Sequence, residues 1–84
     1  MFDLRGKNFL ITGAGAPRGI GFACAKALAE LGAGIYLTSR SERVLDRGQE
    51  LGAPASAHDL TNVQQVNLLI ENVVQKLGGI SGVI

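Results

Sequence analysis

Glycines are concentrated in one stretch near the start of the chain, between an apolar run and a helical pattern. Six residues of this stretch are candidates to contact a ligand: Gly13, Gly15, Arg18, Gly19, Ile20 and Gly21. Glycine reaches backbone conformations closed to other residues, and its missing side chain lets the backbone approach a phosphate closely. At a strand-to-helix switch, such a loop also lies beside the free N–H groups of the helix start, which bind anions. The chemistry that this stretch favours is binding of the pyrophosphate of a dinucleotide.

Other kinds of glycine loop make different demands on the sequence. An ordinary glycine-rich turn that packs a helix against a strand needs only the glycines, so it remains an alternative. A Walker-type phosphate loop requires Gly-Lys-Ser/Thr at the helix start, whereas Gly19 is followed by Ile20 and Gly21. The sequence therefore excludes the Walker type.

The second apolar run ends in Thr38, Ser39 and Arg40 and has no carboxylate at its end. In nucleotide-binding folds an acidic residue at this place binds the ribose of NAD, while a nearby arginine accommodates the extra phosphate of NADP. Arg40 and Arg18 could hold a phosphate dianion through charge-assisted hydrogen bonds, with Ser39 beside them. Each arginine could equally be a solvated surface residue. The missing acid together with the two arginines favours NADP over NAD.

The apolar pattern predicts the elements that must hold these residues. Short β-rich runs predict strands over 7–12, 34–38, 53–58 and 80–84. Helical spacing that ends at glycines predicts helices over 20–31, 42–51 and 62–77. The third strand is the weakest, because it contains Pro54. The order β-α-β-α-β-α-β with short connections predicts an α/β fold of the Rossmann type, a parallel sheet with helices on both faces, of which only the first half is present.

Caps and apolar stripes add detail to the predicted helices. Ser41 is expected to cap the second helix, and Thr61 with Gln64 has the form of a capping box for the third. One stripe of the first helix is expected to face the core and comprises Ile20, Ala23, Cys24, Ala27, Leu28 and Leu31. Cys24 is therefore expected to be a core residue and not a nucleophile.

Length, charge and cysteine content exclude several classes of protein. The 84 residues carry one cysteine, so no internal disulfide forms, which favours a reducing, cytoplasmic location. The net charge of +1 comes from interleaved signs, which makes nucleic acid a poor candidate partner. No apolar run reaches the roughly 18 residues that span a bilayer, so no membrane partner is expected. A chain of this size forms at most one domain.

Four motifs in order along the chain carry a family resemblance. They are Leu4-Arg5-Gly6-Lys7, the glycines of 12–21, Asp59-Leu60 and Gly78-Gly79-Ile80-Ser81. Together they resemble the N-terminal, cofactor-binding segment of the short-chain dehydrogenase/reductase family. The resemblance covers essentially all of the chain and implies an NAD(P)-dependent oxidoreductase, in which Asp59 and Leu60 contact the adenine.

Two places depart from the family's pattern. The loop has five residues between Gly13 and Gly19, more than the common motif of the family. Either the loop is longer, as in the divergent enoyl reductases of the family, or Ala14 and Gly15 are an insertion ahead of a motif of standard spacing. Ser81 replaces the aspartate that usually precedes the fourth strand.

The family's catalytic Tyr-x-x-x-Lys pair is missing from this sequence. The one tyrosine, Tyr36, has Arg40 four residues later instead of a lysine. His58, next to Asp59, is expected to lie near the adenine pocket without a catalytic role. We therefore expect residues 1–84 to be the N-terminal part of a single NAD(P)-binding Rossmann domain, truncated before its catalytic half, with no catalytic residue and no metal site.

The function that the resemblance implies is binding of NADP(H) in an oxidoreductase. A complete chain would transfer hydride between NADPH and a carbonyl or alcohol substrate, as 3-oxoacyl reductases do, or would reduce an enoyl substrate. A small-molecule substrate and a homo-oligomeric partner are expected only for such a complete chain. Two alternatives stay open. One is a non-catalytic nucleotide-binding or interaction module, or a gene remnant; the other is half of an S-adenosylmethionine-dependent methyltransferase, although the acid expected at its second strand end is absent.

Overall fold

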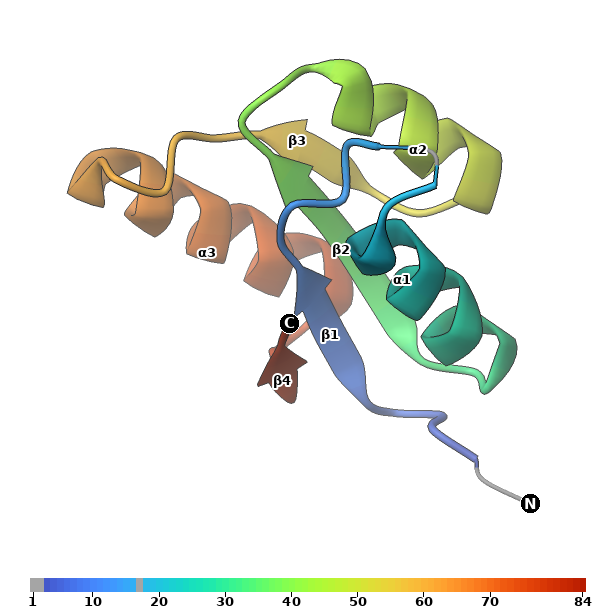
Figure 1. Cartoon of the computed structure of the whole chain (residues 1–84). Helices are drawn as coiled ribbons and strands as arrows, with labels where there is room; N and C mark the ends of the chain where they lie inside the picture. Colours follow the sequence, from blue (N-terminus) through green and yellow to red (C-terminus); the bar gives the residue numbers. More distant parts are fainter. Residues whose placement is uncertain (1–2, 17) are drawn as a thin grey trace.

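The computed structural model describes residues 3–16 and 18–84 (Figure 1). Strands and helices alternate as β1 (Asn8–Ile11), α1 (Ile20–Glu30), β2 (Gly34–Ser39), α2 (Arg43–Leu51), β3 (Ala55–Ala57), α3 (Val63–Leu77) and β4 (Gly82–Val83). This is the order predicted from the apolar pattern, with small shifts at the ends of the elements. In the part of the chain that the structure describes, no helix is both long and apolar enough to cross a membrane.

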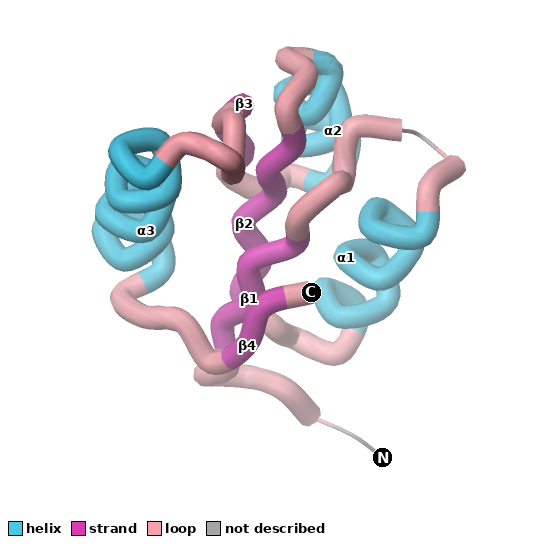
Figure 2. Tube along the Cα trace, turned by 60° about the vertical axis from the view of Figure 1, so that its left-hand side comes forward, coloured by secondary structure: helices cyan, strands magenta, loops and turns pink. Residues whose placement is uncertain are grey.

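The four strands form one parallel sheet in the order β3-β2-β1-β4. Figure 2 shows α1 and α2 on one face of this sheet and α3 on the other. The architecture confirms the predicted Rossmann-type α/β fold, of which the chain forms the first half. Because the strands are parallel, their carboxyl ends lie at the same edge of the sheet.

β1 and β2 form the centre of the molecule and are buried on both faces. Toward α1 and α2, the core comprises Ile11, Ala14, Phe22, Ala25, Ile35, Leu37 and Val44. Toward α3, it comprises Leu10, Tyr36, Leu69 and Val73. Successive residues of each strand therefore serve opposite faces, as expected for strands enclosed between two helical layers.

The predicted apolar stripe of α1 is only partly correct, because Leu28 packs against the core whereas other members of the stripe are exposed. The helix buries Phe22 and Ala25 against the sheet, and Cys24, predicted as a core residue, is half-buried. The exposed side of the helix carries Ile20, Ala23 and Ala27. Because α1 has apolar residues on both sides, their spacing predicts the helix but not the side that is buried.

α3 begins with a different cap from the one predicted. Asn62 is the N-cap residue, and its Oδ1 accepts hydrogen bonds from the N–H groups of Gln64 and Gln65 at 2.9 and 3.2 Å. Thr61 instead donates its hydroxyl to Asp59. The predicted capping box of Thr61 and Gln64 is therefore wrong.

Two further predictions change in detail. The N-cap residue of α2 is Glu42 and not Ser41, although the Ser41 hydroxyl accepts a hydrogen bond from the N–H of Arg43 at 3.2 Å. The weak third strand is present as β3, paired in parallel with β2. Pro54 lies directly before β3 and uses its carbonyl to accept from the N–H of Leu37 at 3.0 Å. The missing N–H of proline therefore costs no hydrogen bond in the sheet.

Ser81 joins the start of β1 to the segment before β4. Its hydroxyl accepts a hydrogen bond from the N–H of Asn8 at 3.1 Å, and its own N–H donates to the Asn8 carbonyl at 2.7 Å. The Asn8 side chain in turn donates to the carbonyl of Leu77, at the end of α3, at 3.0 Å. The serine that departs from the family's pattern therefore has a defined place in the packing.

Replacing Asn62 with alanine should lower the free energy of unfolding by about 1 kcal/mol, because it removes the acceptor for two N–H groups at the start of α3. Gln64→Ala is the matched control, since Gln64 is exposed and offers the cap only its backbone N–H. Urea unfolding followed by circular dichroism measures both variants. If Gln64→Ala lowered the free energy of unfolding as much as Asn62→Ala does, the result would support the predicted capping box of Thr61 and Gln64.

Candidate nucleotide-binding site

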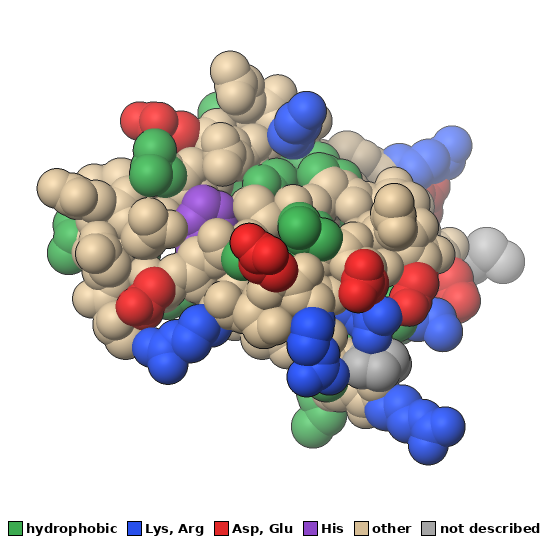
Figure 3. All heavy atoms as spheres, turned by 90° about the horizontal axis from the view of Figure 1, so that it is seen from above, with side chains coloured by type: hydrophobic (Ala, Val, Ile, Leu, Met, Phe, Trp, Pro, Cys, Tyr) green, Lys and Arg blue, Asp and Glu red, His purple; other side chains and the backbone are tan. Residues whose placement is uncertain are grey.

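The predicted site residues come from three connections at one edge of the sheet. The glycine loop follows β1, Ser39 and Arg40 lie at the end of β2, and Asp59 and Leu60 follow β3. This is the upper edge in Figure 1, formed by the carboxyl ends of the strands, where open parallel sheets bind their ligands. Figure 3 views the molecule from above this edge and shows acidic and basic side chains interspersed over it.

The glycine loop packs against the end of β2. Ala14 is buried, and its N–H donates to the carbonyl of Thr38 at 3.2 Å. A Cβ placed on Gly15 would lie only 2.9 Å from Oγ of Ser39. The absence of a side chain at Gly15 therefore lets the loop lie against Ser39, and these two predicted site residues are brought together.

Two glycines of the loop have clear structural requirements. Gly13 has a φ of +64° at the turn out of β1, in the left-handed region that favours glycine. A Cβ on Gly21 would lie 3.0 Å from the carbonyl oxygen of Thr12 and 3.1 Å from that of Gly13. In the dinucleotide fingerprint, the first glycine makes the tight turn and the last permits close packing of helix on strand. These roles favour a longer loop that begins at Gly13 over an insertion ahead of a standard motif.

The start of α1 is open to an anion. Gly19 is the N-cap residue and has no side chain to accept from the first N–H groups, and no acidic residue stands in the first turn. Unsatisfied N–H groups and the positive end of the helix dipole together attract a phosphate. Arg18 and Ile20 flank Gly19, and both are exposed. Within the described part of the chain, the Arg18 side chain makes no hydrogen bond to the other predicted site residues.

Arg40 and Asp59 form an ion pair across the ends of β2 and β3. Nη2 of Arg40 lies 3.4 Å from Oδ1 of Asp59, and the two side chains are 77% and 46% exposed. Asp59 also accepts hydrogen bonds from the hydroxyl and the N–H of Thr61, at 2.7 and 3.0 Å. The Thr61 hydroxyl, followed by its N–H and by Arg40, holds the pKa of Asp59 below its usual value. Thr61 was predicted to cap α3, so sequence analysis missed it as a neighbour of the site; Leu60 lies exposed between the two.

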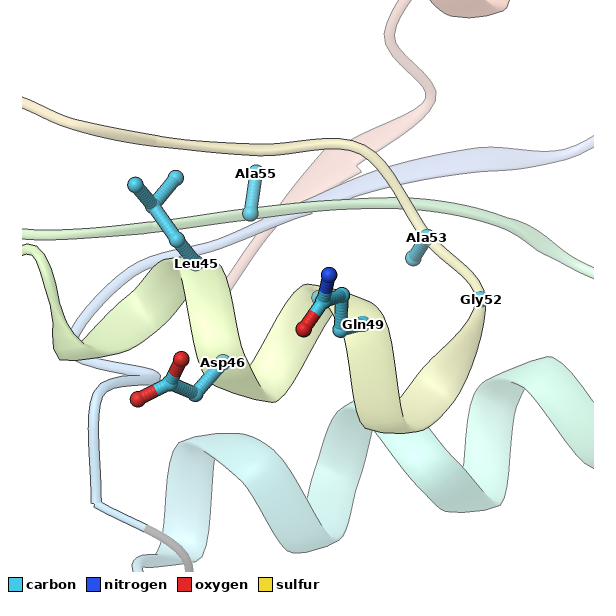
Figure 4. A pocket seen from close by; sticks show the side chains of 7 residues that line it. Leu45, Asp46, Gln49, Gly52, Ala53 and Ala55 are labelled. Carbon is cyan, nitrogen blue, oxygen red and sulfur yellow. The ribbon is translucent and has the colours of Figure 1, made fainter.

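A hollow away from this edge lies between α2 and β3 (Figure 4). Its lining comprises Leu45, Asp46, Gly48, Gln49, Gly52, Ala53 and Ala55. Leu45 and Asp46 project to different sides of α2, and most other lining residues are small. Small-molecule sites place several polar groups so that they converge on one ligand. The hollow is therefore a weaker candidate than the carboxyl edge of the sheet.

Comparison with known proteins points to one family. A family model described as Enoyl-(Acyl carrier protein) reductase matches residues 13–84. The chain is 35% identical over 75 residues to the NADP-dependent mannitol dehydrogenase of Hypocrea jecorina, a match that covers 89% of this chain and 26% of that protein. It is 36% identical over 86 residues to Enoyl-(acyl-carrier-protein) reductase (NADH) 1 of Rhizobium meliloti, covering 96% of this chain and 32% of that protein.

Solved structures agree with these relatives. The crystal structure of a short chain dehydrogenase from Mycobacterium smegmatis matches 99% of this chain and 38% of its own, with a TM-score of 0.88 and 27% identity. The parallel sheet, the helices on both faces and the glycine turn after β1 define a Rossmann-type α/β fold. Within that class, the chain belongs to the short-chain dehydrogenase/reductase family, whose members are NAD(P)-dependent oxidoreductases. It spans about a quarter to a third of the length of the two curated relatives.

Gly21→Ala should lower the free energy of unfolding by about 1–3 kcal/mol, because its Cβ meets backbone oxygens that cannot move aside without separating α1 from β1. Gly79→Ala is the control, since a Cβ there meets no described atom within 4 Å. Urea unfolding of the two variants measures the difference. Equal stability of both would show that α1 does not approach β1 as closely as described.

The lowered pKa of Asp59 makes its interactions sensitive to acid. They are fully present above the pKa of Asp59 in the unfolded chain and are lost as the pH falls through the native pKa. Thr61→Ala should raise the pKa of Asp59 further than Arg40→Gln does, because the Thr61 hydroxyl is the larger cause. Titration of the Asp59 carboxyl carbon by NMR measures both shifts. A larger shift in Arg40→Gln would reverse this order of causes.

Proposed function

We propose that this chain binds the adenosine and pyrophosphate portion of NADP(H) within a short-chain dehydrogenase/reductase. One observation carries the proposal: Arg40 stands beside Ser39 at the end of β2, where NAD-binding folds of this type place a carboxylate. The whole protein would then transfer hydride between NADPH and a carbonyl or alcohol substrate.

The pyrophosphate lies, under this proposal, on the N–H groups at the start of α1. Gly13, Gly15 and Gly19 let the backbone approach the phosphate oxygens, and Gly21 lets the helix start lie close to β1. Support comes from the start of α1, which has neither a side-chain cap nor an acidic residue to compete with the phosphate. Ile20 then contacts the pyrophosphate through its backbone N–H.

The adenosine with its 2′-phosphate lies at the ends of β2 and β3. Arg40 is largely exposed and, among the described residues, its side chain is held by one ion pair, with Asp59, so it can turn to a phosphate at small cost. Arg18 reaches the same phosphate from the glycine loop. Asp59 and Leu60 contact the adenine ring.

The reacting groups lie outside the described residues in this proposal. Tyr36 is 3% exposed, and its hydroxyl pairs with Ser56 inside the layer between the sheet and α3, so it does not face a substrate. The chain also spans 26% and 32% of the two curated relatives. We infer that residues 1–84 are the N-terminal part of one NAD(P)-binding domain, and that another part of the whole protein supplies the catalytic groups.

Reduction of an enoyl substrate with NADH is the second candidate. The family model carries the description of an enoyl reductase, and the Rhizobium meliloti relative has NADH in its name. The long loop between Gly13 and Gly19 resembles that branch of the family. The Hypocrea jecorina relative is named as NADP-dependent, so the names of the two relatives do not agree on the cofactor. We therefore base the choice of NADP on Arg40.

Adenosine 2′,5′-bisphosphate and ADP test the choice of cofactor on the purified chain, because only the first carries a 2′-phosphate. Arg40→Asp should weaken the bisphosphate about 10–100-fold, the equivalent of a lost charge-assisted hydrogen bond, and should change the affinity for ADP much less. Arg43→Asp is the matched control, since Arg43 is another exposed arginine and its replacement changes the charge equally. Isothermal titration or NMR measures both affinities.

Each outcome of this titration has a defined meaning. If Arg40→Asp weakened both ligands equally, the proposed contact between Arg40 and the 2′-phosphate would be contradicted. The NADH-dependent enoyl reductase would then be favoured. Failure of the unaltered chain to bind either ligand would contradict the nucleotide site itself.

A further inference from the structure

Four side chains form a continuous chain of hydrogen bonds across β2, β3 and α3. Oη of Tyr36 lies 2.6 Å from Oγ of Ser56, which lies 2.8 Å from Nε2 of His58. Nδ1 of His58 lies 3.2 Å from Oε1 of Gln65. Tyr36 is buried, and the other three side chains are half-buried. We call these four residues the His58 relay.

The polarity of the relay follows from the chemistry of its two ends. The amide oxygen of Gln65 only accepts hydrogen bonds, so Nδ1 of His58 carries the proton and donates it. In the imidazole tautomer with its proton on Nδ1, Nε2 is an acceptor and receives the hydroxyl hydrogen of Ser56. With its hydrogen given to Nε2 in that tautomer, Ser56 accepts from the Tyr36 hydroxyl. In this arrangement each of the three contacts pairs one donor with one acceptor, which favours one arrangement of the four side chains.

The relay spans the connection between β3 and α3, residues 59–62, which carries Asp59 and Leu60. His58 precedes this connection, and its N–H donates to the carbonyl of Ser39 at 2.9 Å. Gln65 lies in the first turn of α3, beyond the connection. The bond between His58 and Gln65 therefore closes the loop from one end to the other, while Asp59 and Thr61 bond within it.

We propose that His58 is a positioning residue for the adenine subsite. By joining β3 to α3 through Ser56 and Gln65, it fixes the 59–62 connection so that Asp59 and Leu60 face the adenine. The proposal rests on the proposed function only for the identity of that ligand. Sequence analysis expected His58 near the adenine pocket without a catalytic role, and it missed the positioning role because the partners of the imidazole cannot be recognised from spacing along the chain.

Two isosteric variants separate the halves of the relay. Asparagine places an amide nitrogen where Nδ1 lies, so His58→Asn keeps the bond to Gln65 and loses the bond to Ser56. Glutamine reaches the place of Nε2, so His58→Gln keeps the bond to Ser56 and loses the bond to Gln65. Gln65→Leu removes the same bond from the other side. Gln64→Leu is the control, because Gln64 is the exposed neighbour of Gln65.

The ligands are 5′-AMP, which carries adenine, and inorganic pyrophosphate, which does not. His58→Gln and Gln65→Leu should each weaken 5′-AMP by about fivefold, the equivalent of one net hydrogen bond, and leave pyrophosphate unchanged. His58→Asn and Gln64→Leu should bind both ligands with nearly the affinity of the unaltered chain. Equal weakening of both ligands, or no weakening, would mean that the relay serves only the stability of the fold and would overturn the proposal.

Amide hydrogen exchange at Thr61 tests the relay without a nucleotide. Loss of the bond between His58 and Gln65 should speed exchange at Thr61 in Gln65→Leu but not in Gln64→Leu. If the unaltered chain binds neither ligand, the proposed function fails, and unchanged exchange at Thr61 would then overturn the relay as well. If His58→Gln does not fold, Gln65→Leu carries the same comparison.

Discussion

The pairing of β1 with β2 is the constraint on which the rest of the structure depends. Both strands are buried on both faces, and the register sets Ile11 beside Leu37 toward α1 and α2, and Leu10 beside Tyr36 toward α3. A shift of one residue would exchange these faces and place the Tyr36 hydroxyl in the wrong helical layer. The same register brings the loop after β1 to the end of β2, where the N–H of Ala14 bonds to β2. The arrangement of residues at the carboxyl edge therefore depends on the register that the core imposes on β1 and β2.

The contact of Gly21 with the end of β1 decides how α1 is seated on this pair. A Cβ on Gly21 would lie 3.0 and 3.1 Å from the carbonyl oxygens of Thr12 and Gly13, so the glycine lets this side of α1 lie close to the end of β1. Phe22 and Ala25 then enter the core. Apolar residues stand on both sides of α1, so the period of the pattern identifies the helix but does not by itself identify the buried side.

Features that depend on residues close together in the sequence could be predicted, whereas contacts between distant segments could not. Element order and the glycine turns rest on local signals, and the structure confirms them, including φ values above zero at Gly13 and Gly52. Caps failed where two residues able to cap stand side by side: Thr61 bonds to Asp59, which leaves Asn62 to cap α3. The ion pair of Arg40 with Asp59 joins residues that follow two different strands, so no spacing along the chain predicts it.

At the carboxyl edge of the sheet, the Arg40 side chain can leave Asp59 without releasing the Asp59 carboxylate from its other contacts. Asp59 accepts two hydrogen bonds from Thr61, and the stronger influence on its pKa comes from the Thr61 hydroxyl and not from Arg40. The contact with Arg40 is long and exposed, which makes it weak in water. If a phosphate bound the Arg40 guanidinium, the hydrogen bonds from Thr61 would therefore still hold the Asp59 carboxylate in place. In this arrangement, Arg40 can select the nucleotide while Asp59 stays in position for the adenine.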